Sequence, residues 1–374
     1  MNVPKLRFKE FSDEWKKAKL SSFVNINPKN NSLPDKFIYI DLESVNNGLL
    51  TSRKIVNKSE APSRAQRTII KNDILYQTVR PYQMNNLFIN SLDSDYPYIA
   101  STGYALLRTK ENPYFVYSIL YQKSFVNKVL DMCTGTSYPA ISANDLGTIS
   151  ICLPSIKEQE KIGKTLSLLD KKIELQTKKI EDLKLFKKGL IHNEKRNNNF
   201  WNEYKISDIM NITRGTVIPK MEISECLNNE FRYPVYSSQT SNNGILGYDN
   251  KYDFNGKFLT WTTDGANAGK VFYREGKFRC TNVCGILYNK DNRYVSELTA
   301  ELLNIETPKY VSYVGNPKLM NNVMSNIIIK LPDPSRDHFF SSILKIINKK
   351  LTIEEEKLDK LFELKKGLMQ NMFV

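Results

Sequence analysis

Hydrophobic residues recur every three or four positions in two long segments of the chain, and this spacing predicts two long helices. In the first segment they are Ile162, Leu166, Leu169, Ile173, Ile180, Leu183 and Leu190. In the second they are Phe340, Leu344, Ile347, Leu351, Leu358, Leu361 and Leu368. Such a seven-residue repeat is typical of a coiled-coil seam. At about 1.5 Å per residue, a helix over residues 156–193 would be about 57 Å long.

The two helical segments belong to a duplication with a constant offset. Leu153-Pro154 precedes the first and Leu331-Pro332 precedes the second, which sets the offset in numbering (331 − 153 = 178). The segments end in Lys187-Lys188-Gly189-Leu190 and Lys365-Lys366-Gly367-Leu368, which keep that offset. A period near half of the 374 residues indicates two domain-sized copies, whereas solenoid repeats have periods of about 20–50 residues.

The borders of the two copies correspond, whereas their interiors look unrelated. Residues 139–154 align with residues 317–332, and both stretches end in a strand candidate. Trp15 and Trp201 mark equivalent domain starts with a larger offset (201 − 15 = 186), so the second globular part is shorter by the difference (186 − 178 = 8). The pattern of apolar positions predicts strands at 39–42, 68–79 and 98–108 with a helix at 114–131, and then strands at 257–262, 271–274 and 278–288 with a helix at 294–303.

A narrow apolar seam needs a partner in water. Both seams are interrupted by polar residues at equivalent positions, Gln176 and Lys187 in one and Glu354 and Lys365 in the other. Matched lengths and interruptions favour antiparallel pairing of the two helices with each other. Packing of each helix on its own domain, or on another protein, is the alternative. We therefore predict an α+β fold with pseudo-twofold organisation, in which globular domains at 1–152 and 196–330 alternate with paired helices at 153–195 and 331–374.

Composition adds a candidate partner. The net charge of +14 and the pI near 9.3 favour an anionic partner, nucleic acid before a membrane surface. A genome that prefers Lys and Asn codons is the alternative. No apolar run approaches the roughly 20 residues that span a bilayer, so we expect no membrane partner. Five cysteines without framework spacing fit a reducing compartment, and we expect a cytoplasmic protein.

The search for catalytic motifs is negative. Residues 265–270 resemble a phosphate-binding loop but are one residue short and lack its Ser or Thr, so we interpret them as a turn. The sequence contains neither a Gly-x-Ser-x-Gly elbow nor the Asn-Pro-Pro-Tyr motif of adenine methyltransferases. Both histidines, His192 and His338, lie in the helical segments. We therefore expect no catalytic residue, no metal site and no cofactor in this chain.

Polar segments suited to DNA remain. Arginine reads guanine and Gln or Asn reads adenine through paired hydrogen bonds, and basic side chains neutralise phosphates. In the first globular part the candidates are Arg64, Gln66, Arg67, Gln77, Arg80, Tyr82, Gln83, Asn85, Thr136 and Ser137. In the second part they are Ser237, Ser238, Gln239, Thr240, Asn242, Thr262, Thr263, Asn267, Lys270, Thr281 and Asn282. Ordinary solvated loops are the alternative, because Asn and Ser are common in turns.

Over essentially its whole length the chain resembles the specificity subunit of a type I restriction–modification system. The resemblance is carried by the Ile-Cys-Leu-Pro and Ile-Lys-Leu-Pro lead-ins, the two heptad helices and their twin Lys-Lys-Gly-Leu endings. Residues 64–83 and 233–243 also resemble recognition-domain sequence. One departure is that Pro-Asp-Pro-Ser-Arg-Asp-His opens the second helix where Pro-Ser-Ile-Lys-Glu-Gln-Glu opens the first.

The resemblance implies a role without chemistry of its own. Each target-recognition domain would read one half of a bipartite site in double-stranded DNA, and the helices would set the spacer. The chain would recruit two methyltransferase subunits and, through them, restriction (translocase) subunits; S-adenosylmethionine, ATP and magnesium would be used by these partners. The residues assigned to subunit assembly are Ile162, Leu166, Leu169, Ile173, Leu344, Ile347, Leu351 and Leu358. An enzyme with an unrecognised site and an adaptor that binds only proteins are the alternatives.

Overall fold

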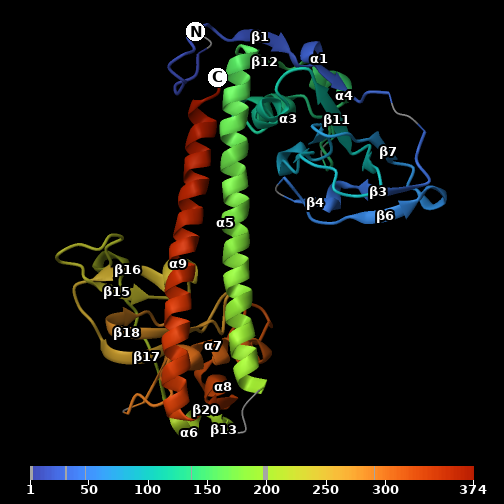
Figure 1. The fold of residues 1–374 in the computed structure, drawn as a ribbon. Coiled ribbons are helices and arrows are strands. Elements are labelled where there is room, and N and C mark those ends of the chain that lie inside the picture. Colours follow the sequence, from blue (N-terminus) through green and yellow to red (C-terminus); the bar gives the residue numbers. More distant parts are fainter. Residues whose placement is uncertain (1–2, 30–31, 47, 136, 197–200, 290) are drawn as a thin grey trace. The chain divides into compact units, whose positions relative to one another are not determined.

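The computed structural model describes residues 3–374 except 30–31, 47, 136, 197–200 and 290 (Figure 1). The chain divides into two compact units. Unit 1 comprises Met1–Thr177 and Glu356–Val374, and unit 2 comprises Lys178–Glu355. Each unit therefore contains one globular part and a portion of each long helix, α5 (Ile156–Arg196) and α9 (Pro334–Asn371).

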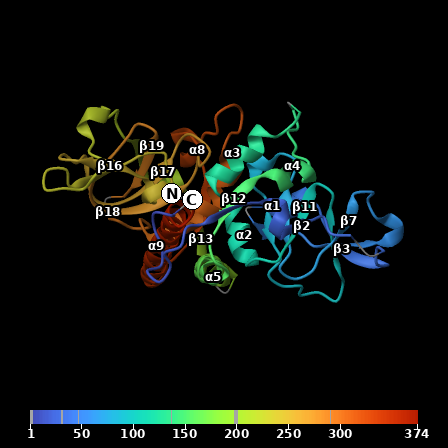
Figure 2. The same cartoon turned by 90° about the horizontal axis from the view of Figure 1, so that it is seen from above.

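Unit 1 contains two four-stranded sheets. The first has the strand order β6 (Lys54–Asn57), β3 (Lys36–Ile40), β10 (Tyr98–Ser101), β7 (Ala65–Thr68). The second has the order β2 (Val24–Ile26), β11 (Tyr104–Thr109), β8 (Ile74–Gln77), β9 (Leu87–Phe88). All neighbours are antiparallel except β3 and β10. Figure 2 shows β2 and β11 of one sheet beside β3 and β7 of the other.

Short helices cover the second sheet and join it to the long helices. They are α1 (Leu20–Phe23), α2 (Pro113–Ile119), α3 (Lys123–Asp131) and α4 (Ala143–Thr148). Strand β1 (Lys16–Lys19) pairs with β12 (Ser150–Leu153), and β4 (Val45–Asn46) pairs with β5 (Leu49–Leu50). The core of this part includes Trp15, Phe115, Phe125 and Leu166 of α5, and Leu368 of α9 packs against it, so the globular part and both long helices share one apolar cluster.

Unit 2 contains one six-stranded sheet. Its order is β14 (Asn211–Arg214), β19 (Cys284–Tyr288), β17 (Phe254–Thr262), β18 (Val271–Cys280), β15 (Tyr233–Tyr236), β16 (Ile245–Asp249). Strand β13 (Trp201–Lys205) pairs with β20 (Ile328–Pro332), the counterpart of the pair β1–β12. The helices are α6 (Ile206–Ile209), α7 (Glu297–Glu306) and α8 (Asn321–Ser325). Trp261, Leu298, Leu303 and Leu344 belong to one buried cluster, so here too a long helix closes the core.

The two long helices run antiparallel and side by side within each unit (Figure 1). All fourteen predicted seam positions are buried or half-buried, as a seam requires. The two lysine interruptions, Lys187 and Lys365, have polar partners at equivalent positions. In unit 1 the Lys365 ammonium lies 2.6 Å from the Asp170 carboxylate. In unit 2 the equivalent Lys187 donates to Asn348 at 3.0 Å (365 − 178 = 187; 170 + 178 = 348). The predicted fold class, α+β with two long packed helices, is confirmed.

The first turns of α5 and α9 differ in sequence, but each anchors its helix to the adjacent globular part. In unit 1 the buried Gln159 accepts a hydrogen bond from the backbone N–H of Asn112, the residue that caps α2. In unit 2 Asp337 (159 + 178 = 337) accepts one from the hydroxyl of Ser296, the residue that caps α7, at 2.8 Å. A buried polar side chain thus ties each long helix to a helix of its globular part, although the residue type differs.

Several predicted elements in the interiors are divided by turns. The strand predicted over 68–79 is split between β7 and β8, with Asn72 in the left-handed region at φ 69°. The strand predicted over 98–108 forms β10 and β11, which enter different sheets around the turn at Gly103. The helix predicted over 114–131 forms α2 and α3. These turns occur within apolar stretches, so hydrophobic periodicity alone does not reveal them.

Candidate nucleic-acid interface

In unit 1 the turn at residues 102–103 brings two predicted DNA-contact segments together. The backbone N–H of Thr102 donates to the carbonyl of Arg64 at 2.9 Å. The backbone N–H and the hydroxyl of Thr78 both donate to the carbonyl of Gly103, at 3.0 and 2.8 Å. The segment that carries Arg64 and Arg67 therefore borders the one that leads to Arg80. Residues from two different sheets meet at a single edge of the unit.

Arg80 is held in an unusual position beside a third segment. Its backbone N–H donates to the carbonyl of Pro139 at 2.7 Å, and its guanidinium lies 4.2 Å from the centre of the Tyr138 ring. Its φ of 54° lies in the left-handed region, as does that of Met84 at 51°. Strained residues of this kind persist where the surrounding structure fixes them, and they cluster at functional sites. Here they bracket the turn Pro81–Gln83.

The three arginines at this edge are not neutralised. Within the described part of the chain, Arg64, Arg67 and Arg80 make no ion pair with a carboxylate. The Nε atoms of Arg67 and Arg80 are buried and have no hydrogen-bond acceptor among the residues that the structure describes. Burial lowers the pKa of Arg67, but a guanidinium starts from so high a value that it stays cationic at neutral pH. Unpaired guanidinium groups suit phosphate or a base edge such as guanine.

Gln77, predicted to contact DNA, instead braces the loop that follows it. Its side chain is only 1% exposed. Its amide nitrogen donates to the carbonyl of Val79 and to the side-chain oxygen of Gln83, both at 2.8 Å, and its amide oxygen accepts from the backbone N–H of Asn85 at 3.0 Å. All of these partners belong to the loop, so Gln77 shapes it from beneath rather than presenting an amide to solvent.

The other unit 1 candidates are distributed around the same loop. Gln66, Tyr82, Gln83 and Ser137 are exposed, whereas Asn85 is half-buried. Thr136 lies outside the described residues. Tyr138 was not among the predicted contacts, although its side chain is 64% exposed and stacks with Arg80. The sequence signal that could have identified Tyr138 is its position between Ser137 and the aligned border, which begins at Pro139.

In unit 2 three predicted segments also converge. The backbone N–H of Thr281 donates to the carbonyl of Tyr236 at 2.9 Å, and the Thr281 hydroxyl donates to Ser237 at 3.0 Å. The backbone N–H of Thr263 donates to the carbonyl of Val283 at 3.1 Å. The segments 236–238, 262–264 and 281–283, distant in sequence, therefore form one edge.

Burial divides the unit 2 candidates into two groups. Thr262, Thr263 and Thr281 are buried, so their side chains support the edge and do not face solvent, contrary to the expected direct contacts. Asn242, Asn267, Lys270 and Asn282 are exposed, and Ser237, Ser238, Gln239 and Thr240 are half-buried. Thr262 is fixed by the backbone N–H of Lys270, which donates to its hydroxyl at 3.1 Å.

Arg274 is a buried cation that the sequence analysis missed. Only 3% exposed, it packs its guanidinium 3.7 Å from the centre of the Tyr236 ring and 4.4 Å from that of Phe272. Burial lowers its pKa. A Cβ added to Gly244 would lie 2.8 Å from an Arg274 terminal nitrogen, so the arginine lies directly beneath the 241–244 turn. Its even spacing from the buried Phe278 and Cys280 on β18 is the signal that could have identified it.

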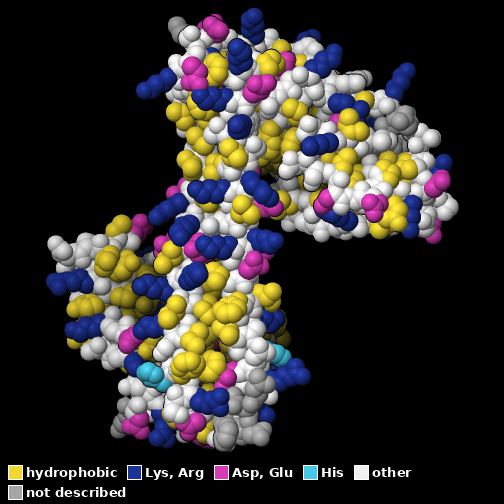
Figure 3. Space-filling model, viewed as in Figure 1, with side chains coloured by type: hydrophobic (Ala, Val, Ile, Leu, Met, Phe, Trp, Pro, Cys, Tyr) yellow, Lys and Arg dark blue, Asp and Glu magenta, His cyan; other side chains and the backbone are white. Residues whose placement is uncertain are grey.

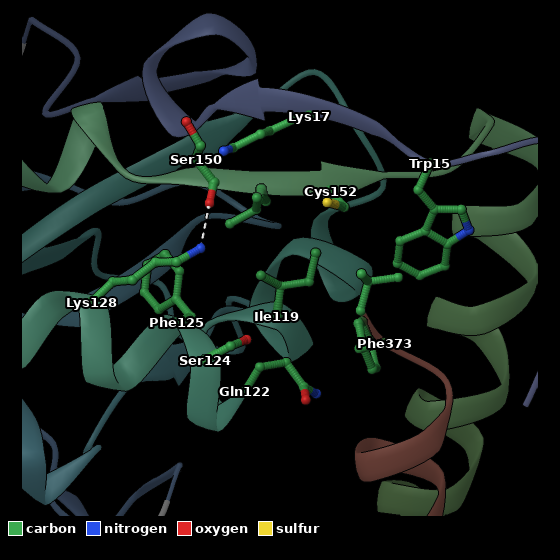
Figure 4. A pocket seen from close by; sticks show the side chains of 12 residues that line it. Trp15, Lys17, Ile119, Gln122, Ser124, Phe125, Lys128, Ser150, Cys152 and Phe373 are labelled. Atoms are coloured by element: carbon green, nitrogen blue, oxygen red, sulfur yellow. Dashed lines mark hydrogen bonds between the residues drawn. The ribbon is translucent and has the colours of Figure 1, made fainter. Parts of the chain in front are cut away.

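Two pockets of unit 1 show no catalytic arrangement among the described residues that line them. One in unit 1, of about 230 Å³, is lined by apolar side chains that include Trp15, Phe125 and Phe373, and by Lys17 and Lys128 (Figure 4). Lys128 donates to the carbonyl of Ser150 at 3.0 Å, and no Asp, Glu or His is among the described residues of the lining. A second pocket, of about 300 Å³, includes Asp170, which is paired with Lys365, and Tyr121, whose pKa burial raises to about 12.

Among the residues described, no group of three or more His, Cys, Asp or Glu side chains could hold a metal ion. The helices in the described ranges include none that is both long and apolar enough to cross a membrane. All five cysteines are free.

The fold defines a class of protein. It is similar to the crystal structure of the S subunit of a type I restriction–modification system from M. genitalium, with a TM-score of 0.71. That likeness covers 100% of this chain and 99% of the other chain at 17% sequence identity. At so low an identity it establishes the shared fold, which is that of the specificity subunits.

Sequence comparison establishes the family. The model of the type I restriction modification DNA specificity domain matches residues 12–185 and 198–363. A Mycoplasma pneumoniae protein described as the N-terminus of a type I specificity subunit is 47% identical over 125 residues, 33% of this chain and 65% of that protein. The specificity subunit of the MpnII type I restriction enzyme of the same organism is 42% identical over 130 residues, 34% of this chain and 38% of that protein. The chain thus spans less than two thirds of these relatives. It belongs to the type I restriction–modification specificity family.

Proposed function

We propose that this chain recognises DNA sequence within a type I restriction–modification complex. Its globular parts, 1–152 and 196–330, would each read one half of a bipartite site in double-stranded DNA. The observation that carries the proposal is the convergence, in each unit, of polar segments distant in sequence at one edge. In unit 1 that edge includes Arg64, Arg67 and Arg80, which have no carboxylate partner within the described ranges. The net charge of +14 supports an anionic partner.

The helices at 153–195 and 331–374 would set the spacing of the half-sites and recruit two methyltransferase subunits. Apolar side chains are exposed at equivalent positions of the two copies (168 + 178 = 346; 175 + 178 = 353). Leu168 and Ile346 are 61% and 69% exposed, and Leu175 and Ile353 are 56% and 41% exposed. Apolar side chains gather over the unit 2 portions of both helices in Figure 3. Exposed apolar patches mark interaction surfaces, and a duplicated patch suits two copies of one partner.

The partners would supply the chemistry. In this proposal the methyltransferase subunits use S-adenosylmethionine, and the restriction subunits that join through them use ATP and magnesium. The seam residues Ile162, Leu166, Leu169 and Ile173, with Leu344, Ile347, Leu351 and Leu358, would hold the helix pair on which these subunits assemble.

The test of DNA recognition uses the chain co-purified with its methyltransferase subunit. Methylated adenines in a random-sequence plasmid library should define a two-part motif, and binding to that motif should weaken steeply as salt rises. Arg64→Ala and Arg67→Ala should each lower binding to the motif, with Lys71→Ala as an exposed control that lies outside the edge. A salt-independent interaction would favour the protein-only adaptor, and methylation or cleavage by the chain alone would favour an enzyme.

Two double variants on the helices test whether the methyltransferase subunits bind to the exposed apolar side chains. Leu168→Asp with Ile346→Asp changes two exposed side chains and should reduce methyltransferase binding while the chain stays folded. Leu169 and Ile347, the next residues along, are 8% and 7% exposed, so Asp at those positions should open the seam and lower the melting temperature. Retention of the methyltransferase by the exposed double variant, measured by analytical size exclusion, would rule out this face.

A further inference from the structure

Two loops, one in each unit, are closed by the same kind of main-chain bridge. In unit 1 the loop spans 134–140 and is closed by an antiparallel bridge between Thr134 and Ala140. In unit 2 the loop spans 312–318 and is closed by an antiparallel bridge between Ser312 and Lys318. The two loops keep the offset of the duplication (134 + 178 = 312; 140 + 178 = 318). They lead into the aligned borders of the two copies, which begin at Pro139 and Pro317.

Each loop holds the end of a strand from the divergent interior through main-chain contacts. In unit 1 the N–H of Arg80 donates to the carbonyl of Pro139 at 2.7 Å, and that of Ile141 donates to the carbonyl of Thr78 at 3.0 Å. Val79 forms a bridge with Ala140. Backbone N–H and C=O groups supply all of these contacts, so the arrangement does not depend on the side chains of the held strand.

Unit 2 repeats the arrangement with different residues. The N–H of Gly265 donates to the carbonyl of Pro317 at 2.9 Å, and that of Leu319 donates to the carbonyl of Thr263 at 2.9 Å. Asp264 forms a bridge with Lys318. Gly265 is therefore the structural counterpart of Arg80, although their offset differs from that of the borders (265 − 80 = 185). Both have positive φ, 93° for Gly265 and 54° for Arg80.

The two edges differ in what the loop exposes. In unit 1 Tyr138 of the loop stacks with the guanidinium of Arg80. In unit 2 the counterpart of Arg80 has no side chain, and the loop instead presents Tyr313 and Val314, which are 68% and 93% exposed. Lys318 of the same loop is also exposed. An aromatic and an aliphatic side chain so open to solvent have no packing role within the described chain.

We propose that the loop at residues 312–318 is the DNA-contact element of unit 2, and that Tyr313 and Val314 determine sequence preference there. This inference rests on the proposed function. An apolar side chain reads the methyl group of thymine in the major groove, and an aromatic ring can pack against an exposed base. Lys318 supplies a cation for a phosphate. Because it carries the same main-chain contacts as its unit 1 counterpart, the loop reaches the place that Arg80 and Tyr138 occupy in unit 1.

The experiment compares three variants in the complex with the methyltransferase subunit. They are Tyr313→Ala, Val314→Ser and the control Met221→Ser, which changes a side chain that is 91% exposed outside the three converging segments. Methylated sites in a random-sequence library give the preference at each half-site. Either loop variant should lower methylation of the preferred second half-site by roughly 5- to 150-fold relative to its single-base alternatives. The first half-site and the control should stay unchanged.

The outcomes separate this inference from the proposed function. An unchanged second half-site, or an equal loss at both half-sites, would overturn the role of the loop while the complex still reads DNA. A fall in melting temperature for Val314→Ser would show that the side chain packs within the protein and would also overturn it. Failure of the unmodified complex to select any motif would refute the proposed function itself.

Discussion

Two replacements of Arg80, by glycine and by alanine, distinguish the effect of its backbone conformation from the effect of its side chain. Arg80 has φ 54° and ψ 55°, and its counterpart in unit 2 is Gly265. A left-handed conformation costs a residue with a Cβ roughly 1–2 kcal/mol. Glycine avoids that cost but loses about 0.5–1 kcal/mol more backbone entropy on folding. Arg80→Gly should therefore be more stable than Arg80→Ala by roughly 0.5–1 kcal/mol. Both variants lose the stacking with Tyr138, so that contribution cancels between them.

The assay is urea unfolding of both variants under one set of conditions, with thermal unfolding as a second measurement. The slope of the free energy of unfolding against urea should be the same for both variants, so that their free energies can be compared. For a unit of this size, 1 kcal/mol corresponds to a melting-temperature difference of about 2–4 °C. Both variants should lose affinity for the preferred DNA equally, by about 1–3 kcal/mol if the guanidinium contacts a base. An alanine variant as stable as the glycine variant would refute the strained conformation. Unequal DNA binding would show that the backbone, and not the side chain, carries the contact.

Three other changes have defined outcomes. Gln77→Ala removes the brace of the 79–85 loop and should cost about 1–3 kcal/mol of stability, whereas the exposed Gln66→Ala should cost little in urea unfolding. Gly285→Ala places a Cβ 2.2 Å from the Trp261 ring and should destabilise unit 2 by about 1–3 kcal/mol in thermal unfolding. A Cβ added at Gly189 would meet no atom within 4 Å beyond its own helix backbone, so Gly189→Ala should stabilise that helix in the same assay. Burial raises the pKa of Asp337 above that of an ordinary aspartate, so the folded state keeps this proton to higher pH and its ionisation disfavours folding. Stability should then fall as pH rises from the ordinary value through the raised pKa, and Asp337→Asn should flatten this part of a pH–stability curve.

The helices and the duplication could be predicted from sequence because both depend on regular spacing. The seam follows a seven-residue period, and every predicted seam position is at least half-buried. The equivalent polar pairs, Lys365–Asp170 and Lys187–Asn348, follow from the same offset. Such a period can be recognised in the sequence because apolar side chains occupy most positions of a seam.

The interiors were less predictable because burial there depends on contacts between distant residues. The sequence indicates both Gln77 and Gln83 as DNA-contact candidates, but only the fold shows that Gln77 is buried beneath the loop that carries Gln83. Thr262, Thr263 and Thr281 also belong to polar segments that the sequence indicates as candidates, and only the fold shows that they are buried. The match between Arg80 and Gly265 escaped detection because their separation (265 − 80 = 185) departs from the constant offset of the borders.

The main-chain hydrogen bonds made by the two loops affect how new variants of this protein can arise. The segments 139–141 and 317–319 hold the incoming strand end by its peptide groups, so they accept a segment whatever side chains it carries. The interior of a related protein could form the same main-chain hydrogen bonds, provided that its strand ends in a residue that tolerates positive φ. Exchange of whole interiors between related genes would then change the DNA-contacting side chains. The main-chain contacts that hold them would stay the same.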